Sequence, residues 1–300
     1  MKIDLFDDDE LFDEEPTSPR ERPPRKPKRK RRRGGGSGET AKRILVALPW
    51  IVFAIAITVA GGLVFAAAMI AIGVVAISEY TSMASRYRPL TIPAYIAVAG
   101  LVVAAHFGTS FNVLYVIAAA FPLLFAFVVR ARLREGATVS LGVTLLGVLW
   151  IGVPLAHAVF LRDLPDHGAA LLIDVLVGTF VADTAAYATG RMFGSHKIAP
   201  NISPNKTVEG LIGGFVIGTM GFWFAGLYQD WLSGVDALLI GAAVAAVAPI
   251  GDLFESMLKR DLGTKDTGTL FGPHGGILDR LDAALFTIVV GYYLSVAVVY

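Results

Sequence analysis

Apolar residues dominate the chain after residue 43, in runs that short polar segments separate. A helical run of about 17–25 apolar residues is long enough to cross the hydrocarbon core of a bilayer. Such runs can be read at residues 44–60, 62–78, 91–106, 111–129, 139–160, 169–190, 211–228, 234–254 and 283–300. The pattern predicts an all-α polytopic membrane protein with about nine transmembrane helices.

Positive charge is divided unequally between the two sides of these predicted helices. If the N-terminus lies inside, the inner loops carry twelve Lys and Arg residues and the outer loops carry only Arg162. Loops rich in Lys and Arg stay on the cytoplasmic side. We therefore expect a multi-pass protein of the inner (plasma) membrane, with the polar segments 191–210 and 256–282 both facing the cytoplasm.

The first 43 residues differ in composition from the rest of the chain. They hold 13 of the 26 Lys and Arg residues and 10 of the 25 acidic residues. A segment this charged cannot bury a core, so the sequence predicts a disordered cytoplasmic tail at 1–43 before a helical membrane domain at 44–300. The chain contains no cysteine, which excludes disulfides, thiolate zinc sites and cysteine nucleophiles.

The segment 256–282 contains four acidic and four basic residues between two apolar runs. Just before it and within it, polar residues recur at the spacing i, i+3, i+4, i+7 and i+8 of one helix face: Asp252, Glu255, Ser256, Lys259 and Arg260. This stripe lies at the end of the eighth predicted span, where its charged side chains could bind a charged substrate. An interfacial ion pair between Asp252 and Lys259 is the alternative interpretation.

Two further acidic residues, Asp279 and Asp282, lie three apart at the mouth of the last predicted span. Together with Asp252 they could hold Mg²⁺, which takes one or two carboxylates and leaves its other positions to water and substrate phosphates. Between these acids, the turn at 272–276 breaks the helix and offers backbone amides to a phosphate. His274 within it could bond a phosphate or nucleotide oxygen, or it could hold the turn together.

A second polar constellation lies at residues 203–210. Ser203 followed by proline suits a helix N-cap and first helical residue. The free amides of such an N-terminus, with Lys206 and Thr207 beside them, suit a phosphate. Further upstream, Asp183 lies inside the sixth predicted span, where an acid is a functional candidate, although a structural pair with Arg191 would also explain it.

These residues resemble the signature of the phosphatidate cytidylyltransferase (CDP-diacylglycerol synthase) family. The matching pattern is Ser256-x-x-Lys259-Arg260-x4-Lys265-Asp266-x-Gly268 and then Gly272-x-His274-Gly275-Gly276-x-x-Asp279-Arg280-x-Asp282. The upstream motif from Ser203 to Gly210 and the intramembrane Asp183 resemble further family features. The similarity covers about 44–300 and departs from the family in two places, with Gly-Pro-His where Pro-Gly-His is usual and Ala283 where serine is common.

The resemblance implies a nucleotidyltransferase that converts CTP and phosphatidic acid to CDP-diacylglycerol and pyrophosphate, in phospholipid biosynthesis. It implies binding of Mg²⁺, with a second cation such as K⁺, and a homodimer among membrane lipids with no nucleic-acid partner. It assigns catalysis to Asp252, Lys259, Arg260, Asp266, Asp279 and Arg280, and metal binding to Asp252, Asp279 and Asp282. It assigns substrate binding to Asp183, Ser203, Asn205, Lys206, Thr207, Ser256, Lys265, His274, Gly275 and Gly276.

Other functions share some of these features. A different CTP-using membrane enzyme, such as a polyprenol or phytol kinase or a synthase acting on ether lipids, shares the topology and matches the signature less well. A transporter could use Asp183 and Asp252 as coupling sites, but the charges of this chain gather at one face rather than at the bilayer midplane. A scaffold without chemistry would not need so many polar groups at one helix mouth.

Overall fold

A computed structural model describes residues 49–132, 135–268 and 275–300 of the chain. The chain divides into two units, 1–47 and 48–300, and the described residues belong to the second. The predicted tail at 1–43 and its boundary with the membrane domain therefore lie outside the described residues.

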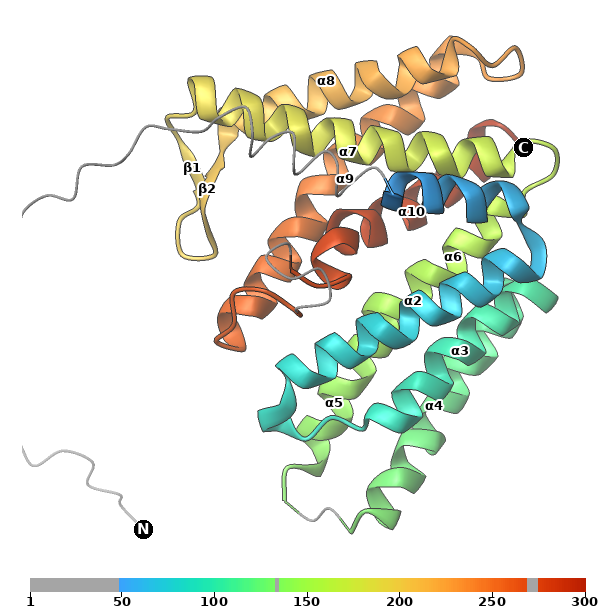
Figure 1. The fold of residues 1–300 in the computed structure, drawn as a ribbon, viewed down its shortest axis with the longest axis vertical. Coiled ribbons are helices and arrows are strands. Elements are labelled where there is room, and N and C mark those ends of the chain that lie inside the picture. The colour runs from blue at the N-terminus through green and yellow to red at the C-terminus, as the bar shows by residue number, and fades with distance from the viewer. Residues whose placement is uncertain (1–48, 133–134, 269–274) are drawn as a thin grey trace, which may run out of the picture. The chain divides into compact units, whose positions relative to one another are not determined.

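Apolar helices succeed one another along the described residues (Figure 1). Their bounds are Pro49–Ala60, α2 (Gly62–Met83), α3 (Thr91–Phe107), α4 (Ser110–Arg130), α5 (Ala137–Gly147), α6 (Val153–Arg162), α7 (Gly168–Phe193), α8 (Val208–Gly226), α9 (Gly234–Asp261) and α10 (Leu278–Val298). A π-helical turn, Val148–Gly152, joins α5 and α6 into one span, and a 3₁₀ turn, Ser85–Tyr87, follows α2.

Within the described part of the chain, seven spans are long and apolar enough to cross a membrane: α2, α4, α5–α6, α7, α8, α9 and α10. Pro49–Ala60 and α3 are apolar but shorter. The predicted polytopic all-helical membrane fold is confirmed, and the predicted number of nine spans is approximate.

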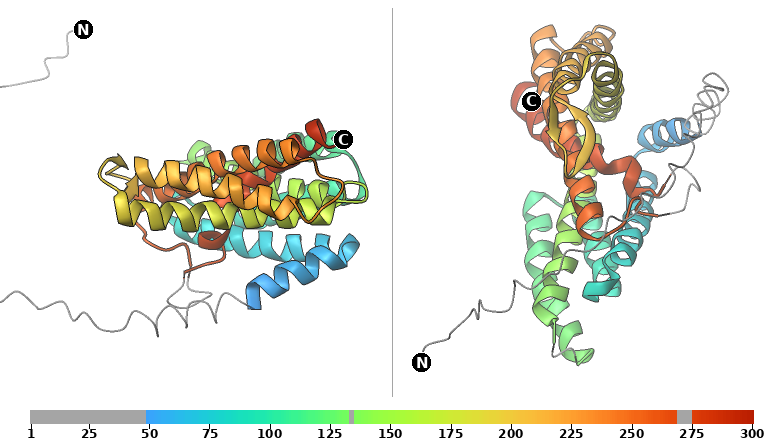
Figure 2. Two further views of the ribbon diagram at one scale, coloured as in Figure 1. Left: turned by 90° about the horizontal axis from the view of Figure 1, so that it is seen from above. Right: turned by 90° about the vertical axis from the view of Figure 1, so that its left-hand side faces the viewer.

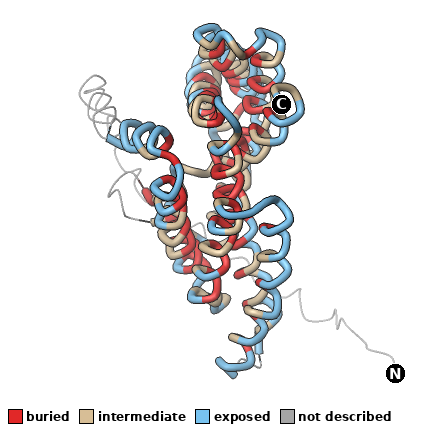
Figure 3. The backbone as a smooth tube through the Cα atoms, turned by 90° about the vertical axis from the view of Figure 1, so that its right-hand side faces the viewer, coloured by how far each residue is buried: buried red, intermediate tan, exposed pale blue. Residues whose placement is uncertain are grey.

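Large apolar side chains cover the outer faces of the helices. Phe107, Phe111 and Tyr115 are each at least 66% exposed, while side chains such as Ile151, Leu171 and Leu285 are fully buried between helices. Figure 3 shows this division, with buried positions on the inward faces. An apolar exterior around satisfied helical backbone is what a bilayer requires.

The helices pack in two groups that α10 connects. In one group α2 packs on α3, and α3 packs on α4 and α6; in the other α7 packs on α8, and α8 packs on α9. α10 packs against α9, α7 and α6. The α7–α8 contact is close because α8 has glycine there: a Cβ at Gly214 would lie 2.8 Å from the Ala182 carbonyl oxygen of α7. Gly213 and Gly218 also leave no room for a Cβ against α7, as is typical of small residues between closely packed membrane helices.

A β-hairpin connects α7 and α8 and lies at one end of both helices (Figure 2). It consists of β1 (Lys197–Ala199) and antiparallel β2 (Ser203–Thr207), with Lys197 opposite Thr207. The prediction that Ser203 caps the next helix is wrong, because Ser203 pairs with Ala199 in the hairpin. The N-cap is Thr207, whose hydroxyl oxygen accepts a hydrogen bond from the Gly210 amide at 3.1 Å.

Candidate active site

The hairpin and the end of α9 meet through charged side chains. The Lys206 Nζ of β2 lies 2.5 Å from Oδ2 of Asp252 on α9, and it also donates to the Pro249 carbonyl oxygen at 3.4 Å. The Arg260 Nε, two helical turns further along α9, donates to the Ile202 carbonyl oxygen at 3.3 Å. The two polar segments predicted from the sequence therefore lie against each other.

A second lysine lies between two carboxylates in the interior of the site. The Lys259 Nζ is 2.9 Å from Oε2 of Glu255 and 2.9 Å from Oδ1 of Asp279, which joins α9 to the first turn of α10. The three side chains are 17%, 1% and 12% exposed, respectively. The alternative pairing of Asp252 with Lys259 is not the one seen, because Lys206 pairs with Asp252.

Three carboxylates gather beside this triad. One oxygen each from Asp252, Glu255 and Asp282 lies within 4.8 Å of the others. The Oε1 atom of Glu255 is buried and has no hydrogen-bond partner among the described residues. Asp183 of α7 lies close enough to Asp252, Asp282 and Lys206 for their charges to act on it. Oxygen ligands around an unsatisfied buried oxygen are a donor set that fits a hard divalent cation.

The composition of this cluster differs from the predicted metal set of Asp252, Asp279 and Asp282. Asp252 and Asp282 belong to it, and Glu255 takes the third place. Glu255 had been recognised only as a member of the polar stripe. Its position three residues after Asp252, on the same helix face, is the signal by which the sequence could have identified it.

Asp279 instead holds the loop that precedes α10. Its Oδ1 accepts from Lys259, and its Oδ2 accepts from the Thr267 amide (2.9 Å), the Thr267 hydroxyl (2.9 Å) and the Gly276 amide (2.8 Å). The Gly276 amide, which the sequence analysis offered to a phosphate, is thus used within the protein. Gly275 beside it has φ of +83°, a left-handed conformation that favours glycine.

Glu79 of α2 is a site residue that the sequence analysis missed. It is only 8% exposed, and its carboxylate accepts hydrogen bonds from the Ile277 and Leu278 amides, both at 3.0 Å. The Thr267 hydroxyl lies 3.2 Å from its Oε2 and shares its one proton between Glu79 and the nearer Asp279. The only sequence signal was a single acid within an apolar stretch, at the end of a predicted span. Its partners lie almost 200 residues away in the sequence.

The remaining predicted residues lie around these carboxylates, some in contact with other side chains and others exposed. The Ser256 hydroxyl is 3.4 Å from Oδ1 of Asp252. The Arg191 guanidinium donates to the Tyr187 hydroxyl at 3.1 Å, so the alternative pairing with Asp183 is not seen. The exposed members of the predicted site among the described residues are Asn205, Arg260, Lys265, Asp266 and Arg280. His274 lies outside the described residues.

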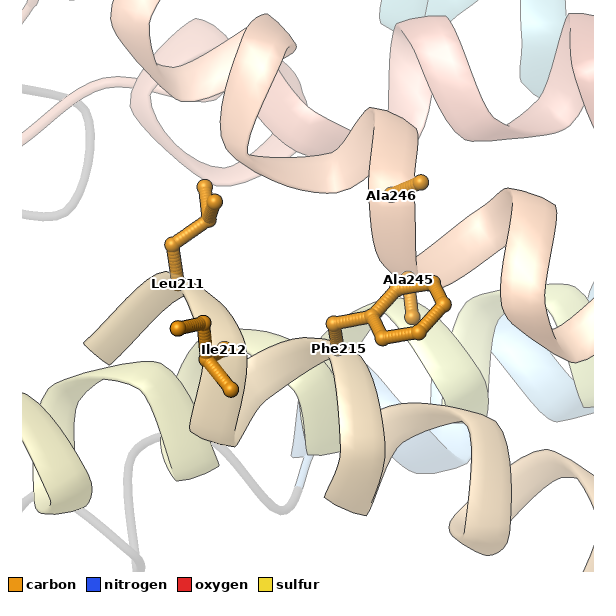
Figure 4. Close-up of a pocket in the computed structure, with 5 residues that line it drawn as sticks. All are labelled: Leu211, Ile212, Phe215, Ala245 and Ala246. Atoms are coloured by element: carbon orange, nitrogen blue, oxygen red, sulfur yellow. The ribbon is translucent and has the colours of Figure 1, made fainter. Parts of the chain in front are cut away.

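An apolar pocket of about 260 Å³ opens between α8 and α9 (Figure 4). Its lining consists of apolar side chains: Leu211, Ile212, Phe215, Ala245 and Ala246. Leu211, Ile212 and Phe215 are partly exposed, so the pocket is open to the surroundings of the helices. Ala245 and Ala246 lie about one helical turn before Pro249, whose carbonyl oxygen contacts Lys206.

Comparison with known proteins connects this site to a family. The profile of the cytidylyltransferase family matches residues 41–298. The chain is 40% identical over 124 residues to the phosphatidate cytidylyltransferase of Haemophilus influenzae, covering 40% of this chain and 43% of that protein. It is 36% identical over 156 residues to the phosphatidate cytidylyltransferase of Bacillus subtilis, covering 52% of this chain and 58% of that protein.

A third relative matches over a longer region. The chain is 28% identical over 253 residues to the phosphatidate cytidylyltransferase of Staphylococcus saprophyticus, covering 82% of this chain and 95% of that protein. The chain thus spans about half the length of the first two relatives and nearly all of the third. The family profile covers most of the chain, including every residue of the candidate site, and it confirms the resemblance seen in the motifs. The chain belongs to the cytidylyltransferase family.

Proposed function

We propose that the chain is a phosphatidate cytidylyltransferase, which transfers the cytidylyl group of CTP to phosphatidic acid and releases pyrophosphate. The observation that carries this proposal is the contact of Lys206 with Asp252, where a basic hairpin meets a carboxylate cluster at the end of membrane helices. The family membership and the names of the three relatives support the same reaction. A phospholipid keeps its chains in the bilayer and its phosphate at the interface, so a site at a helix mouth is accessible to both substrates.

In the proposed reaction, a phosphate oxygen of phosphatidic acid attacks the α-phosphorus of CTP. The new P–O bond forms as the bond from the α-phosphorus to the oxygen bridging to the β-phosphorus breaks, and pyrophosphate leaves with that oxygen. The attacking phosphate is already ionised, so no strong base and no covalent enzyme intermediate are needed. Such transfers depend on positioning and on neutralising charge.

The basic residues differ in their availability for this task. Lys259 is held between Glu255 and Asp279, so it neutralises the protein's own carboxylates and fixes α9 against α10. Lys206 is 22% exposed and has one carboxylate partner, so it can exchange Asp252 for a phosphate oxygen. Arg260 is exposed at the hairpin and can contact the more distant phosphates.

Mg²⁺ is the cation that the family resemblance implies, and the carboxylate cluster fits it. Asp252, Glu255 and Asp282 would hold the ion, with the unpaired Glu255 Oε1 as one donor. A bound Mg²⁺ supplies electrostatic neutralisation of phosphate oxygens. A second cation such as K⁺ could be bound at the same cluster, where Asp183 adds a fourth carboxylate.

The lipid chains and the orientation in the membrane complete the proposal. The apolar pocket lies between two spanning helices, and its Ala245 and Ala246 precede by about one turn the Pro249 whose carbonyl oxygen contacts Lys206. It can therefore receive part of an acyl chain of a lipid whose phosphate contacts the lysine. The asymmetry of Lys and Arg supports a site on the cytoplasmic face of the inner membrane. We also propose a homodimer, as in the family, and a role in phospholipid biosynthesis.

The reaction is tested by release of radiolabelled pyrophosphate from γ-labelled CTP. Purified protein is assayed in detergent–phosphatidate micelles with Mg²⁺ and with EDTA. We expect release that requires both phosphatidate and Mg²⁺. Release with a polyprenol but not with phosphatidate would change the lipid substrate, and no release with either lipid from folded protein would refute the proposal.

A matched pair of variants tests the role of the hairpin lysine. Lys206→Ala removes the contact with Asp252, whereas Lys197→Ala removes an exposed lysine of the same hairpin. We expect kcat to fall at least about tenfold in the first variant and to stay near the wild-type value in the second. Equal effects of the two substitutions would show that the hairpin contributes only general positive charge.

A further inference from the structure

The carboxylate of Glu79 caps a helix to which it does not belong. α10 begins at Leu278, and its own N-cap residue, Ile277, provides no side-chain cap. Glu79 of α2 accepts the amides of both residues, through Oε1 from Ile277 and through Oε2 from Leu278. Free amides at a helix N-terminus favour an anion, so Glu79 replaces the missing cap from another part of the chain.

No basic side chain neutralises Glu79 among the described ion pairs. Its negative charge is therefore compensated mainly by the amides at the start of α10, with the Thr267 hydroxyl shared between Glu79 and Asp279. A buried carboxylate without such donors would be costly, so carboxylate and helix end stabilise each other. Glu79 thus depends on the positions of Thr267, Ile277 and Leu278, and their positions depend on Glu79.

The same turn of α10 carries two carboxylates of the candidate site. Asp279 directly follows the capped residue Leu278, and Asp282 lies one turn further along. The Thr267 hydroxyl lies 3.2 Å from Glu79 and 2.9 Å from Asp279. A continuous series of contacts therefore runs from Glu79 through Thr267 and Asp279 to Lys259 and on to the carboxylate cluster.

The glycines around this turn fit closely against Glu79. A Cβ at Gly268 would lie 2.6 Å from Oε1 of Glu79, and a Cβ at Gly276 would collide with the same carboxylate. The loop thus leaves little room for any change in the position of Glu79. This packing gives Gly268 and Gly276 a role in receiving a protein carboxylate.

We propose that Glu79 is a positioning residue, which holds the first turn of α10 so that Asp279 stays on Lys259 and Asp282 stays in the cation cluster. It acts through α10 and touches no substrate. The consequence is that α2, in the N-terminal half of the chain, controls the geometry of a site whose other residues come from the C-terminal half. This inference rests on the proposed function for its effect on activity, but not for its effect on α10.

Hydrogen–deuterium exchange of the full chain in detergent tests the contact itself. Glu79→Gln keeps the size of the side chain and removes its charge, and Glu79→Ala removes the cap. We expect amides of residues 275–282 to exchange roughly five- to thirtyfold faster in both variants, the factor that corresponds to a lost capping interaction. Arg86→Ala is the matched control, because Arg86 follows α2 and its described contacts are with Tyr87 and with Asp261 of α9, not with a residue of α10.

A second measurement tests whether the contact positions the cation cluster. Mg²⁺ that binds the folded protein raises its unfolding temperature with a midpoint set by its affinity. We expect this midpoint to rise about tenfold or more in Glu79→Gln and to stay unchanged in Arg86→Ala. Thr267→Val removes only the hydroxyl between the two carboxylates and should also raise the Mg²⁺ midpoint. This variant provides the test if the Glu79 variants do not fold.

The outcomes separate this inference from the proposed function. Unchanged exchange at 275–282 in the Glu79 variants, or faster exchange with an unchanged Mg²⁺ midpoint, would overturn the positioning role. A wild-type protein that binds Mg²⁺ but releases no pyrophosphate would refute the proposed function alone. In an active enzyme, Glu79→Gln should lower kcat and raise the Mg²⁺ requirement with little change in KM for phosphatidate.

Discussion

Replacing Asp279 by asparagine removes one charge from the centre of the candidate site and keeps the size of the side chain. The wild-type carboxylate accepts four hydrogen bonds. Three converge on Oδ2, from the amide and hydroxyl of Thr267 and from the Gly276 amide, and the fourth joins Oδ1 to Lys259. An asparagine side chain has only one carbonyl oxygen. It can therefore accept hydrogen bonds either from Lys259 or from the donors of Thr267 and Gly276, but not from both groups.

The geometry determines which side is lost. The carbonyl oxygen of the new amide takes the place of Oδ2, where three donors meet, and its NH₂ group then faces the ammonium of Lys259. The loss of one hydrogen bond between charged groups costs about 1.5–3 kcal/mol in the free energy of unfolding. For a domain of this size, each kcal/mol lowers the unfolding temperature by about 2–4 °C, so the expected decrease is about 3–12 °C.

Asp252→Asn is the matched substitution in the carboxylate cluster of Asp252, Glu255 and Asp282. Asp252 is 31% exposed and pairs with the partly exposed Lys206, so its loss should cost at most about 1 kcal/mol of stability. Its turnover should nevertheless fall by roughly a hundredfold or more, because the cluster loses one of its three carboxylates. Asp279→Asn should instead reduce both the unfolding temperature and the turnover.

Thermal unfolding of both purified variants, with pyrophosphate release at a series of Mg²⁺ concentrations, distinguishes these expectations. The reasoning would be refuted if Asp279→Asn unfolded at the wild-type temperature and only its Mg²⁺ requirement increased. That result would make Asp279 a cation ligand, as the sequence analysis predicted, rather than the residue that holds the loop.

Three further substitutions test other parts of the structure. Thr207→Ala removes the N-cap of α8 and should lower the free energy of unfolding by about 1 kcal/mol, seen as a decrease of about 2–4 °C in unfolding temperature; no decrease would argue against the cap. Gly276→Ala places a methyl group against Glu79 and should speed amide exchange at residues 275–282, whereas wild-type exchange would mean that the turn is not tightly packed. Ile212→Ala enlarges the apolar pocket, and Ile217→Ala alters the same helix outside it, so only the first should change the ratio of kcat/KM for dioleoyl and dioctanoyl phosphatidate; equal ratios would contradict the proposed acyl-chain site.

The membrane helices could be predicted well because each one depends on a local property of the sequence. The run at 169–190, for example, corresponds to α7 at Gly168–Phe193. Helix ends were less predictable where a helix continues beyond its apolar run. α9 continues through the polar stripe to Asp261, and α10 begins at Leu278 rather than at 283, because hydrogen bonds to distant side chains stabilise these polar turns.

The site residues could be found from their types, but their partners could not. The spacing of Asp252 and Lys259 on one helix face suggested that they pair, yet the hairpin brings Lys206 to Asp252. Ser203-Pro204 suits a helix start as well as a strand edge, and only the pairing with β1 decides between them. Glu79 has no local motif, because its contacts are with Thr267 and with the Ile277 and Leu278 amides, far along the chain.

The balance of charge at the site supports the proposal that the nucleotide binds together with a divalent cation. Asp183, Asp252, Glu255 and Asp282 lie close enough for their charges to interact. Two lysines contact this group: Lys206 pairs with Asp252, and Lys259 pairs with Glu255 while it also pairs with Asp279. Carboxylates in such excess repel a polyphosphate, and the repulsion is stronger where the groups are partly buried. A nucleotide that arrives together with a divalent cation satisfies the carboxylates and presents its phosphates to Lys206 and Arg260. This balance supports the proposed binding of a metal–nucleotide pair rather than of a free anion. The buried Oε1 of Glu255, which has no hydrogen-bond partner within the described protein, is an oxygen that such a cation would satisfy.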